Sequence, residues 1–178
     1  VEVAELRSPG PTAVGDDPIN VIETMARLCP RADDEFDDKA WVRLVAPLRT
    51  GEGRGGTARP ITDAMTSAAT RVAESVGAKA LLCLTRSGFT VRAMARFRPR
   101  TPILGFSPDE RVRRQLAISW GSTPIAITGF ADNETMVAEA LMIARRDGHV
   151  RSGENVVVLA GTDAKSPATD VLRVVRVP

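Results

Sequence analysis

Short apolar runs alternate with amphipathic stretches over the last two thirds of this 178-residue chain. Five of the runs have the length and aliphatic composition of strands buried in a sheet. They are 79–84, 102–106, 124–127, 155–160 and 171–177. Apolar residues that recur at helical spacing predict four helices among these runs. They cover 62–76, 87–97, 108–118 and 132–146.

The ends of the predicted helices carry capping residues. Thr62 or Asp63 can cap the first helix, and Gly77 closes it. Gly148 closes the last helix. In that last helix three residues are expected to face the core. They are Ala138, Leu141 and Met142.

This order of elements predicts a three-layer α/β/α sandwich. Strands that alternate with helices of 10–15 residues form crossover units, and these give a mostly parallel sheet of about five strands. Only about ten residues, with no helical pattern, separate the last two strands. Because that gap is too short for a helical crossover, the last strand is expected to be antiparallel at the edge.

The first sixty residues have a different organisation. An Asp-Asp-Pro sequence at 16–18 predicts the start of a helix with an apolar stripe, and Pro30 is expected to end it. The stripe consists of Val21, Ile22, Met25 and Leu28. A lone helix cannot bury its own apolar face, so it must dock on another part of the protein. The predicted parts are a helical segment at 1–30, a linker at 31–60 and the α/β domain at 61–178.

Charge and composition narrow the class of function. Residues 1–60 carry eight basic and eleven acidic side chains, a net of −3, whereas residues 61–178 carry sixteen and eleven, a net of +5. This excess is too small for a nucleic-acid surface, and tyrosine is absent. No apolar run approaches the roughly 20 residues of a membrane span, and the first residues lack the basic and apolar regions expected of a signal peptide. With only two cysteines, the expected location is a reducing compartment such as the cytoplasm.

No set of residues for catalysis or metal binding is apparent. His149 follows Gly148 at a helix end and fits a capping role, and Cys83 fits a core position. The acidic cluster at 33–38 has no calcium-loop spacing and is typical of a solvated linker. Four arginines are expected to form a solvated face or an interface. They are Arg92, Arg96, Arg98 and Arg100.

Three loops follow strands at the edge where open α/β sheets bind ligands. They are 85–90, 107–109 and 161–169. The first contains Thr85, Arg86, Ser87, Gly88, Phe89 and Thr90 and leads directly into a helix. Its hydroxyls, its glycine and the free N–H groups at a helix start suit a phosphate. On spacing alone, a lone Ser-Gly loop is more typical of a simple helix cap.

Several segments together resemble the pyruvate kinase family. The sequences AKALLCLTRSGFT at 78–90 and MARFRPRTPI at 94–103 are similar to its strand, T-x-S-G loop and following helix. Trp120-Gly121, Gly153-Glu154 and the end at 173–178 also fit. Residues 62–178 therefore resemble the C-terminal domain of that family. Residues 12–27 resemble the last helix region of its catalytic barrel.

The resemblance implies a regulatory and subunit-contact domain of a glycolytic enzyme. It implies that the loop at 85–90 holds a phosphorylated effector, a sugar monophosphate or nucleotide, and that the loop at 161–169 closes over it with Gly161, Lys165 and Ser166. The expected partners are the protein's own catalytic barrel or sister subunits of a homo-oligomer. The catalytic residues and the magnesium and potassium ligands would belong to the barrel, so this chain alone is expected to be inactive and without cofactor.

Three residues distinguish this chain from effector-binding members. Pro167 lacks an N–H donor, Asp170 adds negative charge, and Met136 occupies the helix position where some members place an arginine for a second phosphate. A monophosphate is therefore expected rather than a bisphosphate. The alternative is a free-standing domain that binds no effector and acts as a structural or protein-interaction module.

Overall fold

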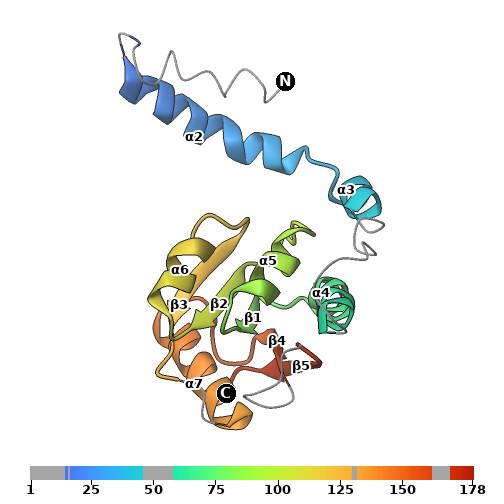
Figure 1. Ribbon diagram of the computed structural model, residues 1–178. Helices are drawn as coiled ribbons and strands as arrows, with labels where there is room; N and C mark the ends of the chain where they lie inside the picture. Colours follow the sequence, from blue (N-terminus) through green and yellow to red (C-terminus); the bar gives the residue numbers. More distant parts are fainter. Residues whose placement is uncertain (1–14, 16, 46–57, 130–131, 162–168) are drawn as a thin grey trace. The chain divides into compact units, whose positions relative to one another are not determined.

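The computed structural model describes residues 15, 17–45, 58–129, 132–161 and 169–178. The chain divides into two compact units, Val1–Asp37 and Asp38–Pro178. The described part of the first unit is essentially one helix, and the second unit contains the sheet (Figure 1). The predicted effector-loop residues Lys165, Ser166 and Pro167 lie outside the described residues, as do residues 1–14 and Asp16.

The helix of the first unit, α2, runs from Pro18 to Asp34. Its N-cap is Asp17, whose carboxylate accepts a hydrogen bond of 3.1 Å from the Asn20 N–H. The prediction that Pro30 ends the helix is wrong, because α2 continues for four more residues. A proline removes one backbone hydrogen bond, and here the bond from the Glu35 N–H to the Arg31 carbonyl still closes the last turn. No residue of α2 is buried within the described structure.

A single five-stranded sheet lies at the centre of the second unit. Its strands are β1 (Ala80–Leu84), β2 (Ile103–Ser107), β3 (Ser122–Ala126), β4 (Asn155–Ala160) and β5 (Val171–Arg176). Their spatial order is β3-β2-β1-β4-β5. All pairs are parallel except β4 with β5, which is antiparallel. The mostly parallel sheet and its antiparallel edge strand are thereby confirmed.

The described residues of this unit form five helices (Figure 1). They are α3 (Asp38–Val45), α4 (Ala58–Ser75), α5 (Phe89–Ala95), α6 (Glu110–Leu116) and α7 (Asn133–Arg146). Of these, α4, α5, α6 and α7 contact the sheet. The segment predicted as a linker thus contains α3 and the start of α4. Helix α4 begins at Ala58, so Thr62 and Asp63 do not cap it. Their side chains bond to other segments instead, as described below.

The sheet has an apolar core on each face. Along β1, Leu81 and Cys83 point into the cluster with α4, α5 and α6, whereas Leu82 and Leu84 point into the cluster with α7. This alternation follows from the period of two along a strand. All five residues of β1 are buried, as expected for a strand covered on both faces. The predicted three layers are confirmed.

Helix α7 presents a different face to the sheet from the one predicted. Leu141 is buried, but Ala138 is exposed and Met142 is 62% exposed. The inward residues are Met136, Val137, Ala140, Leu141, Ile143 and Ala144. Apolar residues surround much of this helix, so more than one stripe has helical spacing, and the pattern alone does not select between them. The prediction that Gly148 closes this helix is confirmed, because Gly148 has a left-handed φ of +78°.

The two cysteines are expected to differ sharply in reactivity. Cys83 is completely buried, and burial raises the pKa of its thiol to about 12, whereas Cys29 is exposed. A thiolate is the reactive form, so Cys83 stays inert at pH 8. Titration with Ellman's reagent should give one thiol per native chain and two in denaturant. The Cys29→Ser variant should give none until it unfolds, and rapid native reaction of both thiols would contradict the buried position of Cys83.

Candidate functional site

The candidate site lies at the carboxyl edge of the parallel strands. Thr85 directly follows β1, and its N–H donates to the Phe106 carbonyl at 3.0 Å, which extends the pairing with β2 by one residue. The loops that leave β1, β2 and β4 all start from this edge. Polar groups from separate parts of the chain therefore meet here, as in other open α/β sheets.

A tight turn shapes the loop after β1. Gly88 has a φ of +74°, and its N–H donates to the Thr85 hydroxyl oxygen at 2.9 Å. A Cβ at this position would lie 2.8 Å from Arg92 Nη1 and 3.0 Å from Leu116 Cδ2. Both the backbone conformation and the close approach require glycine. One of the predicted N–H donors is thus already bonded within the loop.

The exposed part of this loop is polar and basic. Ser87 and Arg86 are exposed, and Phe89 is half-buried. One turn into α5, the Arg92 guanidinium donates to the Ser87 carbonyl at 3.1 Å, which holds a second positive charge against the loop. The sequence placed Arg92 on a solvated face or an interface, and Arg92 is exposed, but its bond to the loop was not predicted. Arg92 follows Ser87 by five residues across the start of α5. This spacing is the feature of the sequence that could have indicated its contact with the loop.

Three threonines form a buried chain beside the loop. The Thr90 and Thr169 hydroxyls lie 2.6 Å apart, and the Thr169 N–H donates to the Thr62 hydroxyl oxygen at 3.1 Å. Each of these residues is at most 6% exposed. The chain fixes the end of the 161–169 loop next to the start of α5. It also explains why Thr62 does not cap α4, since its oxygen accepts from Thr169. Of the predicted effector residues, Thr85, Gly88 and Thr90 are buried and Gly161 is half-buried.

The surroundings on the α7 side are acidic and apolar. A cavity of about 450 Å³ there is lined by Asp132, Glu134, Val137, Val158, Ala160, Val171 and Arg173. Hydrogen bonds from the hydroxyl and N–H of Thr135 lower the pKa of Asp132, so that carboxylate stays charged. Met136 is 2% exposed and lies in the core. A second phosphate would find no cation at the Met136 position.

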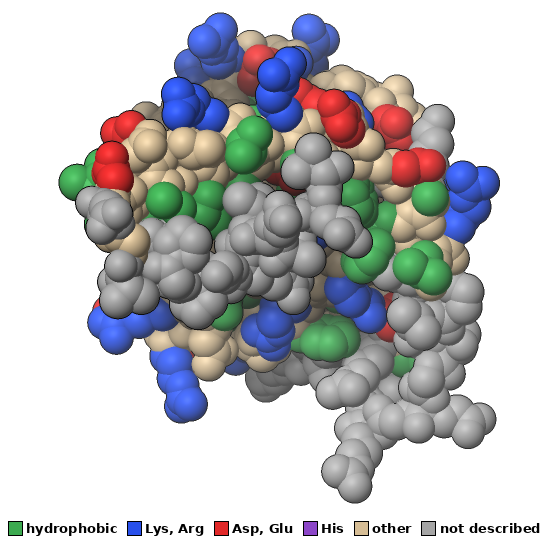
Figure 2. Space-filling model, turned by 90° about the horizontal axis from the view of Figure 1, so that it is seen from above, with side chains coloured by type: hydrophobic (Ala, Val, Ile, Leu, Met, Phe, Trp, Pro, Cys, Tyr) green, Lys and Arg blue, Asp and Glu red, His purple; other side chains and the backbone are tan. Residues whose placement is uncertain are grey.

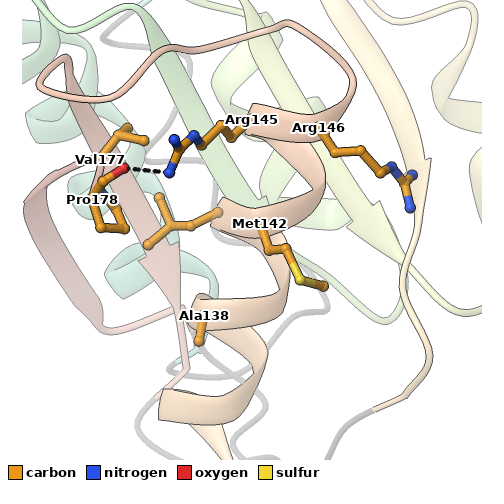
Figure 3. Close-up of a pocket in the computed structure, with 7 residues that line it drawn as sticks. Ala138, Met142, Arg145, Arg146, Val177 and Pro178 are labelled. Carbon is orange, nitrogen blue, oxygen red and sulfur yellow. Dashed lines mark hydrogen bonds between the residues drawn. The ribbon is translucent and has the colours of Figure 1, made fainter.

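A groove at the opposite edge of the sheet is less suited to an anion (Figure 3). It measures about 580 Å³ and is lined by Ala138, Leu141, Met142, Arg145, Arg146, Val177 and Pro178. Val177 follows β5, whose end pairs with the amino end of β4. Arg145 donates to the Pro178 carbonyl at 2.8 Å, and Arg146 forms an ion pair with Asp147. The arginines of this groove already have partners, and its floor is apolar.

The described surface shows no other specialised site. On the face drawn in Figure 2, basic side chains are spread out with acidic ones between several of them, and they form no continuous stripe. Among the described residues, no three His, Cys, Asp or Glu side chains come together as a metal site. No described helix is long and apolar enough to cross a membrane.

Residues 63–175 match the family model described as "Pyruvate kinase, alpha/beta domain". This chain belongs to that family. The pyruvate kinase of Clostridium acetobutylicum is 29% identical over 166 residues, which are 93% of this chain and 33% of that protein. Pyruvate kinase 2 of Synechocystis is 30% identical over 164 residues, 92% of this chain and 26% of that protein. The chain therefore spans about a third or less of these pyruvate kinases.

Solved pyruvate kinases share the fold. The crystal structure of a pyruvate kinase from Cryptosporidium parvum superposes with a TM-score of 0.77 over 95% of this chain and 32% of that one, at 22% identity. The region with the sheet is thus a pyruvate kinase C-terminal α/β domain, and the resemblance inferred from the loop and helix motifs is confirmed.

Proposed function

We propose that this chain is the regulatory and subunit-contact domain of a pyruvate kinase and that it binds a phosphorylated effector at the loop after β1. One observation carries the proposal. Ser87 and Arg86 are exposed in this loop, and the Arg92 guanidinium donates to the Ser87 carbonyl. Hydroxyl and guanidinium donors in a tight turn are the groups that recognise a phosphate.

The loop at 161–169 would complete the site. Its far end is fixed beside α5 by the bond between Thr90 and Thr169, so a ligand at Ser87 would lie next to it. Lys165 and Ser166 belong to this loop and are the proposed further contacts. A single phosphate fits best. Met136, which stands where a second phosphate would need a cation, is buried, and Asp132 and Asp170 would repel a further negative charge.

The remaining functions are proposals that family membership supports. We propose that the residues for phosphoryl transfer from phosphoenolpyruvate to ADP, and the magnesium and potassium ligands, lie in a catalytic barrel outside this chain. On this proposal the domain acts in glycolysis in the cytoplasm, as part of a homo-oligomer. No catalytic role is assigned to a residue of this chain.

Ligand-dependent thermal stability tests the proposed site. Glucose 6-phosphate and AMP, each at millimolar concentration, are the probes. A ligand present at ten times its Kd stabilises the folded state by about 1.4 kcal/mol, which raises Tm by roughly 3–6 °C for a chain of this size. At least one probe is expected to raise Tm by this amount. Tryptophan fluorescence monitors the thermal unfolding. The Ser87→Ala and Arg92→Leu variants should lose most of this shift in Tm.

Ser75→Ala provides the matched control for this experiment. Ser75 is exposed on α4, and its hydroxyl donates to the Arg71 carbonyl one turn earlier in the same helix. The control should keep the full shift. If neither probe stabilises the folded protein, and Ser87→Ala changes nothing, the effector site is refuted. The interaction module without effector then becomes the better account.

A further inference from the structure

The turn after α5 holds an arginine in an unusual backbone conformation. Arg98 has a φ of +46°, in the left-handed region that is uncommon for a residue with a Cβ. It also precedes Pro99, and the residue before a proline is normally extended. A conformation that is disfavoured for both reasons persists only where contacts of the surrounding structure stabilise it.

Two tryptophan rings provide such contacts. The Arg98 guanidinium carbon lies over both rings, 4.4 Å from the centre of Trp120 and 5.4 Å from the centre of Trp41. Both distances are within the range of a cation–π interaction. Trp120 lies in the turn before β3, and Trp41 belongs to α3. The side chain of Arg98 therefore connects α3 with the turn before β3.

Trp41 makes a second contact with the turn after α5. Its indole N–H donates to the Arg96 carbonyl at 2.7 Å. The Arg96 guanidinium forms an ion pair with Asp63 of α4, whose side chain is only 11% exposed. The residue that accepts the indole N–H is thus itself bound to α4.

Helix α3 has little buried surface apart from these contacts. Trp41 and Val42 are half-buried, and the other side chains of α3 that the structure describes are exposed. Leu82 of the central strand β1, by contrast, is completely buried. Elements with few buried contacts open at a free-energy cost well below that of global unfolding. Helix α3 is therefore expected to separate from the α/β unit while the sheet stays intact.

We propose that α3 is a strap that undocks from the folded α/β unit, and that the contacts of Trp41 with Arg96 and Arg98 control this undocking. The inference goes beyond the proposed function and involves no effector. Helix α3 begins at Asp38, directly after the end of the first unit. Undocking therefore adds the eight residues of α3 to the connection between the two units. It also removes one of the two rings that stabilise the left-handed conformation of Arg98.

Hydrogen exchange of the full 178-residue chain under native conditions tests the undocking. In ¹H–¹⁵N spectra, the protection factor of the Trp41 indole N–H should be at least about tenfold lower than that of the Leu82 amide. Its exchange should also be nearly independent of urea below the unfolding transition, because local opening exposes little surface. The signal missing from Trp41→Phe is the Trp41 indole. If this indole and the Leu82 amide have the same urea dependence, α3 does not undock on its own and the proposal is overturned.

Arg98→Gly tests the contribution of the guanidinium. Glycine adopts a left-handed conformation at little cost, so the variant removes the cation and not the turn. The protection of the Trp41 indole is expected to fall about threefold or more. Arg98→Lys keeps a positive charge and should retain more of the protection. Unchanged protection in Arg98→Gly, or equal losses in the two variants, would contradict control of the strap by Arg98.

Trp41→Leu provides the reverse measurement. The Arg98 N–H donates to the Ala95 carbonyl at 3.1 Å, and its exchange should become about threefold faster or more when the Trp41 ring is removed. Leu44→Ala is the matched control, because Leu44 lies on the same helix and is 64% exposed. It should change neither the Arg98 amide nor the Trp41 indole.

The reverse measurement also decides the proposal if Arg98→Gly does not fold. Trp41 is half-buried on α3, outside the sheet, so Trp41→Leu leaves the strands and their packing unchanged. Unchanged exchange of the Arg98 amide in Trp41→Leu would overturn the proposal. None of these measurements uses a ligand, so their outcome is independent of the proposed effector site.

Discussion

Replacing Phe106 with alanine is expected to lower the free energy of unfolding by about 3–5 kcal/mol. Phe106 lies in β2 with its ring completely buried on the α7 side of the sheet. Its register partners are Leu84 of β1 and Ile125 of β3, which also contribute to that core. Truncation loses the transfer free energy of the ring and leaves a cavity among strands that cannot collapse to fill it.

Urea unfolding followed by tryptophan fluorescence measures this effect, because both tryptophans belong to the α/β unit. Ile118→Ala is the control. Ile118 is 92% exposed, so its truncation should change stability by less than about 0.5 kcal/mol. A loss below about 1 kcal/mol for Phe106→Ala, at an unchanged dependence on urea, would contradict the packing described for this core.

Gly88→Ala is expected to destabilise the α/β unit by about 2–4 kcal/mol and to weaken any ligand bound at Ser87. The left-handed φ of +74° costs roughly 1–2 kcal/mol for a residue with a Cβ. The new methyl group would also lie 3.0 Å from Leu116, which is fully buried and cannot move aside freely. Relief of that overlap costs about 1–2 kcal/mol more.

Gly77→Ala separates these two causes. Gly77 has a similar φ of +61°, but a Cβ there would meet nothing within 4 Å. Its variant should show the conformational cost alone, about 1–2 kcal/mol. Equal losses for the two variants, measured by the same urea titration, would mean that the contact with Leu116 contributes nothing.

The sheet was predictable from the sequence because its central strands, β1, β2 and β4, are buried on both faces. A run such as NVVVLA at 155–160 has no polar alternation, and such runs separated by helices leave few possible topologies. The ten-residue gap before β5 excluded a helical crossover on length alone. The predicted elements shifted only at their ends, by a few residues, whereas α3 lies in the segment predicted as a linker.

Features that depend on tertiary contacts could not be predicted in this way. Thr62 has the identity of a helix cap, but Thr169, more than a hundred residues later, uses its oxygen. Arg96 and Arg98 have the composition of a solvated surface, yet their partners are Asp63 and two tryptophans. Local propensity contains no information about such distant partners.

The position of the candidate loop after β1 could be predicted from the sequence, but its internal hydrogen bonds could not. The position of Ser87 and Gly88 after a buried strand located the loop. The sequence did not indicate that the Thr85 oxygen is bonded to Gly88 or that Thr90 faces Thr169. Arg92 was missed because its charge alone does not distinguish a loop contact from an ordinary surface residue.

The position of β4 between β1 and β5 has a consequence for synthesis on the ribosome. Strands β1, β2 and β3 emerge first and can pair in order, but the apolar β4 must find β1 across about seventy residues. Until Val171–Arg176 has also left the exit tunnel, the outer edge of β4 has no partner and could pair with another nascent chain. Strand β5 then covers that edge of β4. Its charged residues Arg173 and Arg176 discourage pairing of the new edge with another chain.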